Sequence, residues 1–251
     1  MSKQLSYQRK GQGDVLVLVH GYLGSSEMWR DQIECFSEHF DVIAPDLPGF
    51  GKSNAFEAPE SIAGFAEAVL KLMDSLGVDQ FNLLGHSMGG MIVQEIAINA
   101  SSRLRSLICY GTGPISVLPS RFETVEQSRQ RILNEGLDVT AKRIAATWFV
   151  NGEQGPGFDL CLEQGEQASL QAALACLTAW DNWDALSRLN AIACRTLVLW
   201  GDKDRSYGWE QPEAIWKTVP GASLAVVPGC AHNVHMEKTD LFNALVVDFI
   251  K

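Results

Sequence analysis

One short stretch of the chain, residues 81–97, constrains the fold more than any other. Residues 81–84 begin apolar, as a buried strand does, and residues 91–97 have the pattern of a helix. Between them lies a Gly-x-Ser-x-Gly motif whose serine is Ser87. A serine that glycines place between a strand and a helix lies on a sharp turn, so its hydroxyl projects clear of the sheet edge. The stretch therefore predicts a nucleophilic serine rather than a chance match in a loop.

The alternation of apolar runs with helical patterns extends over most of the chain. Because these runs are continuous rather than alternating, they are typical of strands that helices cover on both faces. The sequence therefore predicts an α/β protein with a mostly parallel central sheet flanked by helices. The expected strands besides the one before Ser87 lie at residues 15–19, 41–44, 106–110, 196–200 and 222–227.

With its serine turn and this order of elements, the chain resembles the alpha/beta-hydrolase superfamily, and in particular its small bacterial serine hydrolases. The turn at Ser87 looks like the nucleophile elbow of that superfamily. The resemblance covers nearly the whole chain except the middle, and it implies an alpha/beta-hydrolase fold with an inserted helical cap. The serine at position 87 excludes the dehalogenases and epoxide hydrolases of the superfamily as close models, because those enzymes attack with an aspartate.

The resemblance implies an acid and a base for the serine. In this superfamily the loop after the next-to-last strand supplies the acid, and Asp204, the later aspartate of Gly-Asp-x-Asp, matches that position. The base is a histidine on the loop after the last strand, which matches His232. His235 competes for that role, but it lies close to the last helix and is expected to shape the pocket instead. The order Ser87, Asp204, His232 is the Ser…Asp…His order of the superfamily.

Two other aspartates have a structural interpretation. Asp46 and Asp202 are each expected to hold a loop, Asp46 by accepting hydrogen bonds from backbone amides. The end of the strand at residues 106–110 carries no carboxylate, so the acid cannot lie there as it does in some members of the superfamily. Members of the superfamily often have a proline three or four residues after the acid, whereas residues 205–208 contain none. This difference affects the expected conformation of the loop more than the choice of Asp204 as the acid.

The resemblance also implies an oxyanion hole. His-Gly after an early strand marks the oxyanion loop in this superfamily, and the next residue, here Tyr22, donates its backbone N–H. The N–H of Met88, at the start of the helix after the serine, is the second donor. Two fixed donors that converge on one oxygen stabilise the negative charge that develops there.

Between residues 114 and 189 the strand–helix alternation stops and a helical pattern with polar joints replaces it. We interpret residues 114–189 as a helical cap over the strand ends, inserted between the two parts of the core, residues 1–113 and 190–251. Most aromatic residues of the cap are expected to form its own core, and Trp148 is a candidate to line the pocket.

The cap also carries arginines, which are solvated by default. One of them could hold a substrate carboxylate, and Arg121 is our candidate for that role. The arginines considered are Arg121, Arg129, Arg131 and Arg143.

Composition excludes several classes of partner. With 251 residues, of which 46% are hydrophobic, the chain can bury a large core. Its net charge of −10 leaves no basic stripe for nucleic acid and would be repelled by an anionic membrane. The first residues have no signal-peptide pattern, and the six cysteines include no C-x-x-C pair, so we expect reduced thiols and a cytoplasmic protein.

The chain has no metal-ligand cluster and no Gly-x-Gly-x-x-Gly motif, so no cofactor is expected. The predicted function is hydrolysis of a small carboxylic ester or lactone through an acyl-enzyme intermediate. Because the same resemblance includes carbon–carbon bond hydrolases and a lyase, cleavage or elimination on an anionic metabolite is the first alternative. A small-molecule signal receptor of the same fold is the second. The expected partner is a small carbonyl compound, and the sequence leaves the oligomeric state open.

Overall fold

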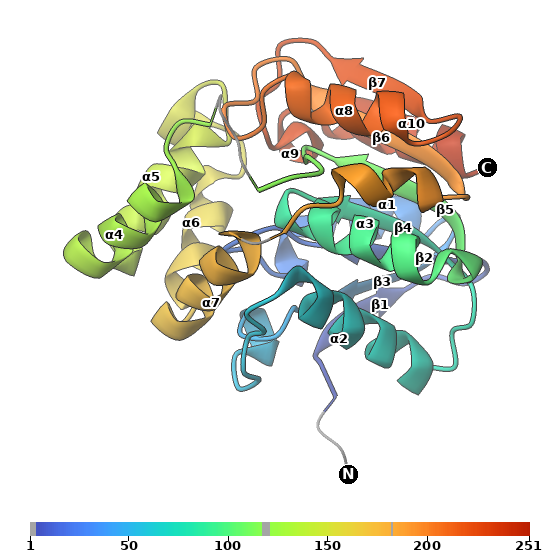
Figure 1. Cartoon of the computed structure of the whole chain (residues 1–251), viewed down its shortest axis with the longest axis horizontal. Coiled ribbons are helices and arrows are strands. Elements are labelled where there is room, and N and C mark those ends of the chain that lie inside the picture. Colours follow the sequence, from blue (N-terminus) through green and yellow to red (C-terminus); the bar gives the residue numbers. More distant parts are fainter. Residues whose placement is uncertain (1–3, 117–120, 182) are drawn as a thin grey trace.

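A computed structural model describes residues 4–116, 121–181 and 183–251 of the chain. Its centre is a seven-stranded sheet with the strand order β1-β3-β2-β4-β5-β6-β7 (Figure 1). The edge strand β1 runs antiparallel to β3, and the other neighbouring strands are parallel. The mostly parallel sheet predicted from the apolar runs is confirmed. The strands are β1 (Tyr7–Lys10), β2 (Val15–Val19), β3 (Asp41–Pro45), β4 (Phe81–His86), β5 (Leu104–Tyr110), β6 (Arg195–Gly201) and β7 (Ser223–Val227).

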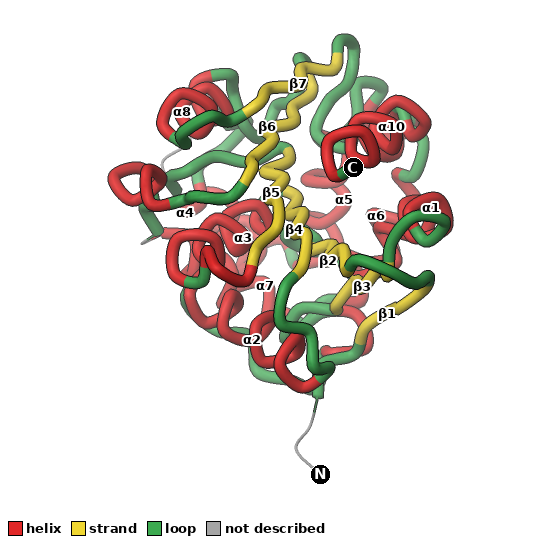
Figure 2. Tube along the Cα trace, turned by 90° about the vertical axis from the view of Figure 1, so that its right-hand side faces the viewer, coloured by secondary structure: helices red, strands yellow, loops and turns green. Residues whose placement is uncertain are grey.

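Helices cover both faces of the sheet (Figure 2). Leu16 and Leu18 of β2 pack in one cluster with α1 and α10, whereas Val17 and Val19 pack in another with α2, α3 and α8. Successive side chains of a strand point to opposite faces, so one continuous apolar run serves both clusters. The helices are α1 (Arg30–Phe36), α2 (Ile62–Ser75), α3 (Met88–Asn99), α8 (Glu210–Thr218), α9 (Val234–Glu237) and α10 (Thr239–Ile250).

The sequence analysis missed β1. Its residues Tyr7–Lys10 carry mostly polar side chains and have no buried position, because the strand lies at the sheet edge. Arg9 forms an ion pair with Asp41 of the neighbouring strand β3. An edge strand with charged side chains discourages pairing with other chains, but it leaves no hydrophobic period to detect.

In the described residues, four further α-helices lie between β5 and β6, and Figure 1 shows them gathered at one side of the sheet. We call them the helical segment α4–α7. Its large aromatic side chains, such as Phe149, Phe158 and Trp180, are buried in the same cluster as α2 and α3. The role of this segment as a cap stays a prediction. Its helices are α4 (Val125–Glu135), α5 (Leu137–Thr147), α6 (Phe158–Gln167) and α7 (Leu170–Asp181).

Within the described residues, no helix combines the length and the apolar character needed to cross a lipid bilayer.

Candidate active site

Ser87 lies on a strained turn between β4 and α3. Its backbone has φ 58° and ψ −121°, a region that a residue with a side chain rarely adopts. The flanking glycines make the turn possible. A Cβ on Gly85 would lie 2.2 Å from the carbonyl oxygen of Gly89, and one on Gly89 would lie 2.4 Å from that of Val19. The glycines of the motif therefore let strand, turn and helix approach closely enough to hold Ser87 in this conformation.

Thr112, which the sequence analysis did not single out, supports the same turn. Its hydroxyl donates a hydrogen bond of 2.8 Å to the carbonyl oxygen of Ser87. Its side chain fills the space beside Gly90, where a Cβ would lie 2.4 Å from the Cβ of Thr112. Gly90, the second glycine after Met88, is the sequence feature that could have indicated this contact, because a larger residue there would clash with Thr112.

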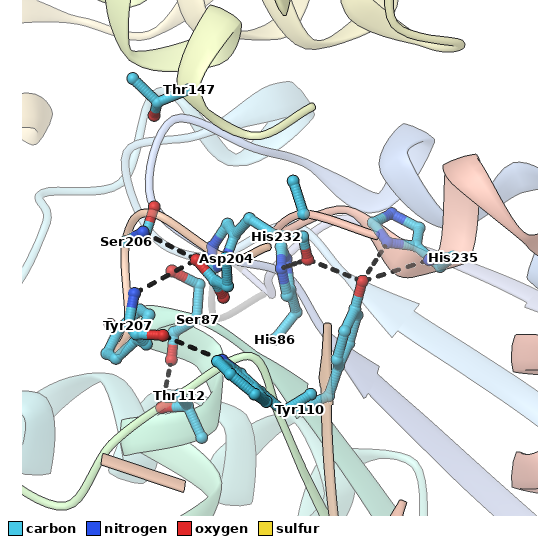
Figure 3. Close-up of polar contacts among 12 residues, drawn as sticks. His86, Ser87, Tyr110, Thr112, Thr147, Asp204, Ser206, Tyr207, His232 and His235 are labelled. Atoms are coloured by element: carbon cyan, nitrogen blue, oxygen red, sulfur yellow. Dashed lines mark hydrogen bonds and ion pairs between the residues drawn. The ribbon is translucent and has the colours of Figure 1, made fainter. Parts of the chain in front are cut away.

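His232 and Asp204 form a buried pair beside the turn (Figure 3). His232 Nδ1 lies 2.8 Å from Asp204 Oδ2, and the two side chains are 1% and 0% exposed. The other carboxylate oxygen, Oδ1, accepts hydrogen bonds from the backbone N–H groups of Ser206 at 2.7 Å and Tyr207 at 3.1 Å. Because both oxygens are engaged, the carboxylate is fixed and orients the imidazole.

The two other aspartates hold loops. Asp46 accepts hydrogen bonds from the backbone N–H groups of Ser26 at 2.7 Å and Lys52 at 3.0 Å, which confirms its predicted structural role. Asp202 Oδ1 accepts a 2.6 Å hydrogen bond from the backbone N–H of Gly229. Neither carboxylate contacts His232 in the described residues.

Ser87 and His232 line one very small cavity of about 10 Å³, together with Tyr22 and Trp148. The ring of Trp148 lies 6.2 Å from that of His232. In the described residues the Ser87 hydroxyl makes no hydrogen bond with the His232 ring, and such bonds are often long before a substrate binds. The other lining residues are His20, Gly21, Gly24, Met28, Trp29 and His86.

Two backbone segments meet at this cavity. Met88 is the first residue of α3, so its N–H has no acceptor within the helix. The loop that carries Tyr22 packs against the serine, because a Cβ on Gly21 would lie 2.9 Å from the Cβ of Ser87. The next residue, Leu23, has a positive φ of 57°. The two predicted oxyanion donors therefore lie on segments that both contact the Ser87 turn.

The comparisons with known proteins decide the family. Residues 14–239 match the family model described as the alpha/beta hydrolase fold. The chain belongs to this family. It is 38% identical over 246 residues to the (E)-2-((N-methylformamido)methylene)succinate hydrolase of Acinetobacter baylyi, covering 94% of this chain and 90% of the relative. It is 30% identical over 263 residues to the 2-hydroxy-6-oxo-6-phenylhexa-2,4-dienoate hydrolase of Burkholderia cepacia, covering 96% and 88%.

The structure of a thermophilic esterase from Thermogutta terrifontis, solved with malate bound, superposes with a TM-score of 0.85. It is 26% identical and the match covers 98% of this chain and 92% of the esterase. The resemblance to this family and the predicted alpha/beta-hydrolase fold are thus confirmed, and the chain is a hydrolase.

In this alpha/beta hydrolase His235 lies behind the cavity rather than in it. The side chain is 1% exposed, and its Nδ1 lies 2.9 Å from the hydroxyl of Tyr110 (Figure 3). It packs among aromatic rings, with the ring of Trp29 at 4.8 Å. The carbonyl oxygen of His232 lies 2.9 Å from the Tyr110 hydroxyl and 3.2 Å from His86 Nε2. Tyr110, His86 and His235 therefore support the loop of His232 from beneath.

Besides His232, the histidines His20, His86 and His235 around this alpha/beta-hydrolase site are buried. Burial lowers the pKa of His20 and lowers that of His86 far more, with His232 adding to the effect on His86. Burial and then His232 lower the pKa of His235 to about 3. All three side chains are therefore neutral near pH 7.

These histidines predict that stability falls with acid. Unfolding lets His20, His86 and His235 take up protons that the folded chain excludes. Below the unfolded-state histidine pKa of about 6.5, this proton uptake stabilises the unfolded state relative to the folded state. Between that value and each lowered folded pKa, each histidine is expected to remove about 1.4 kcal/mol of unfolding free energy per pH unit. Above about pH 6.5 these histidines are neutral in both states, so the free energy of unfolding no longer changes with pH on their account. Urea titrations at about pH 8, 7, 6 and 5 measure this slope.

The matched variants are His235→Gln and His39→Gln. The first removes a buried histidine and is expected to make the slope shallower below about pH 6.5. The second removes an exposed one and is expected to leave the slope unchanged. A free energy of unfolding that stays constant from about pH 7 to pH 5 would contradict the prediction.

Tyr207 is a site residue that the sequence analysis missed. Its ring is fully buried and stacks on that of His232, with centroids 5.7 Å apart and an interplanar angle of 16°. Burial raises the pKa of its hydroxyl, and hydrogen bonding to Ser87 and Thr112 opposes this, which places the hydroxyl beside both side chains. No hydrogen bond of ordinary geometry satisfies that hydroxyl in the described residues.

Arg121 does not line the cavity with Ser87. It differs from Arg129 and Arg131 because it packs against aromatic rings and forms no ion pair in the described residues. Its guanidinium lies over the rings of Phe122 at 4.5 Å and Trp180 at 5.2 Å. Burial lowers its pKa. By contrast, Arg129 and Arg131 each form ion pairs with two acidic side chains.

Proposed function

We propose that this chain is a serine hydrolase that cleaves a small carboxylic ester or lactone through an acyl-enzyme intermediate on Ser87. The observation that carries the proposal is the buried pair of His232 and Asp204, whose atoms lie 2.8 Å apart, at a cavity that the strained Ser87 also lines. A serine hydroxyl is a weak nucleophile at neutral pH and needs such a base.

In the proposed reaction Asp204 holds Nδ1 of His232, which leaves Nε2 to act on the serine. Nε2 takes the proton of Ser87 Oγ as that oxygen attacks the substrate carbonyl. It then donates this proton to the leaving alkoxide, and the acyl-enzyme forms. In the second half His232 removes a proton from water, which attacks the acyl-enzyme and releases the acid.

The backbone N–H groups of Tyr22 and Met88 are the proposed oxyanion hole. Both segments contact the Ser87 turn, and Met88 brings the positive end of the α3 dipole. Trp148 is the proposed apolar contact for the substrate, because it lines the cavity and faces the His232 ring. Its carbonyl oxygen accepts a 3.0 Å hydrogen bond from the N–H of Asn233, which couples residues 114–189, the proposed cap, to the base loop.

A second candidate reaction is carbon–carbon bond hydrolysis or elimination on an anionic metabolite. The name of the dienoate hydrolase favours it, and the name of the substituted-succinate hydrolase favours only an anionic substrate. Those acids would enter a chain of net charge −10, so they need a local cation. No comparable observation favours a receptor function.

The test is a pre-steady-state assay with 4-nitrophenyl esters of short and medium acyl chains. A burst of 4-nitrophenol about equal to the enzyme concentration, followed by steady turnover, is expected from an acyl-enzyme. An organophosphate should label Ser87, as peptide mass spectrometry would reveal. Labelling without ester turnover would favour the second candidate, and the absence of both would sink the proposal.

A further inference from the structure

Several buried polar atoms near the proposed active site lack a hydrogen-bond partner of ordinary geometry in the described residues, and three donors among them lie together. They are Arg121 Nε, Trp180 Nε1 and the hydroxyl of Tyr207, which lies beside Ser87 and Thr112 but makes no hydrogen bond of ordinary geometry with them. Each unsatisfied buried group costs about 1–3 kcal/mol, so folded chains rarely keep several without a reason.

The three donors belong to one continuous cluster. The guanidinium carbon of Arg121 lies 5.2 Å from the ring of Trp180, and the rings of Trp180 and Tyr207 stack at 6.3 Å. Tyr207 in turn stacks on His232 at 5.7 Å. The cluster thus extends from the imidazole at the Ser87 cavity to the partly buried guanidinium of Arg121, across two aromatic side chains. We call Arg121, Trp180 and Tyr207 the donor cluster.

The charge of Arg121 is not neutralised by an ion pair within the described part of the chain. Its Nη1 donates to neutral acceptors, the carbonyl oxygen of Glu123 at 2.7 Å and the hydroxyl of Ser128 at 3.2 Å. The carboxylate of Glu123 is engaged elsewhere, because it accepts from Ser128 and pairs with Arg131. Glu123 is close enough to attract the Arg121 guanidinium, but it makes no direct ion pair with it. A largely buried cation that lacks a direct ion pair is costly, and an anionic ligand would reduce that cost.

We propose that the donor cluster binds a carboxylate of the substrate, so that the enzyme selects esters or lactones that carry a second, ionised acid group. This inference rests on the proposed function, since it places the acid beside the acyl group that Ser87 would attack. The chemistry of the set fits a carboxylate, because one guanidinium, one indole N–H and one phenol supply donors and positive charge. Since Tyr207 contacts both Trp180 and His232, the acid is expected close to the reacting carbonyl.

The test compares two esters that differ in one charge. They are 4-nitrophenyl hydrogen succinate, which carries a free carboxylate, and 4-nitrophenyl methyl succinate, in which that carboxylate is methylated. The wild-type chain is expected to hydrolyse the acid with the higher kcat/KM. Arg121→Gln is expected to lower kcat/KM for the acid about 100-fold and for the methyl ester less than about threefold, the size seen for buried charge pairs. Trp180→Phe and Tyr207→Phe, which each remove one donor, are expected to lower the acid's kcat/KM about 10-fold.

The matched control is Arg143→Gln, which removes the same charge from an exposed position of α5. It is expected to leave both esters unchanged. A wild-type preference for the methyl ester, or equal losses on both esters in Arg121→Gln, would overturn the inference. If Arg121→Gln does not fold, the same comparison in Trp180→Phe decides the question.

A binding measurement separates this inference from the proposed function. Succinate is titrated by calorimetry into Ser87→Ala, which cannot form an acyl-enzyme. Saturable binding that the further change Arg121→Gln weakens about 100-fold supports the carboxylate site even if no ester is hydrolysed. Ester turnover with a burst but no succinate binding and no preference for the acid would keep the hydrolase and remove the carboxylate site.

Discussion

Replacing Ser87 with alanine is expected to lower kcat for 4-nitrophenyl esters by about a million-fold, the loss seen when a serine nucleophile is removed. The substrate cavity is unchanged, so the dissociation constant of the ester should move less than about threefold. Alanine keeps the Cβ of serine and therefore meets the same φ of 58° at the turn. The free energy of unfolding, measured in urea, should consequently stay close to that of the wild type.

That stability measurement is also the control, because an unfolded variant would lose activity for another reason. A Ser87→Ala chain that is folded and keeps more than about one hundredth of the wild-type kcat would contradict the acyl-enzyme mechanism.

Asp204→Asn is expected to lower kcat about ten-thousand-fold. The amide oxygen would take the place of Oδ1, which accepts from the backbone N–H groups of Ser206 and Tyr207. The amide NH₂ would then face Nδ1 of His232 and force the proton onto Nε2, the nitrogen that must accept the proton of Ser87. Stopped-flow assays of kcat across about pH 6 to 9 measure the effect.

Asp202→Asn is the matched control, since Asp202 lies on the same loop and bonds only loop groups in the described residues. It is expected to change kcat less than about threefold. The assignment of the acid would be reversed if the Asp202 variant lost more activity than the Asp204 variant.

Much of the fold could be predicted because its signals are local. The apolar run before Ser87, the glycines around it and the helix after it lie within one short stretch, and the structure turns there as expected. The loops of Asp204 and His232 follow strands that their own apolar runs indicate. The sequence had to choose between Asp202 and Asp204, and the contact of Asp204 with His232 gives that choice a physical basis.

The remaining features depend on contacts between segments far apart in the chain. Tyr207 lies beside Ser87 and stacks on Trp180, although no motif in the sequence around residue 207 predicts those contacts. The environment of Arg121 depends on how α7 packs, because Trp180 of α7 lies beside its guanidinium. The sequence analysis assumed that arginines are solvated and therefore could not predict this contact. His235 has the spacing of a pocket residue, but the ring of Trp29 and the hydroxyl of Tyr110 hold it in the core.

The position of β5 has a consequence for how the chain is made. β5 (Leu104–Tyr110) lies between β4 and β6, yet β6 begins only at Arg195, after the whole helical segment α4–α7. As the protein emerges from the ribosome, β5 has one partner and presents an apolar open edge to which other chains can pair. Parallel pairing across so long a crossover is also slow. A nascent or truncated chain that ends before Arg195 is therefore expected to aggregate more readily than the full chain, whose β6 covers that edge.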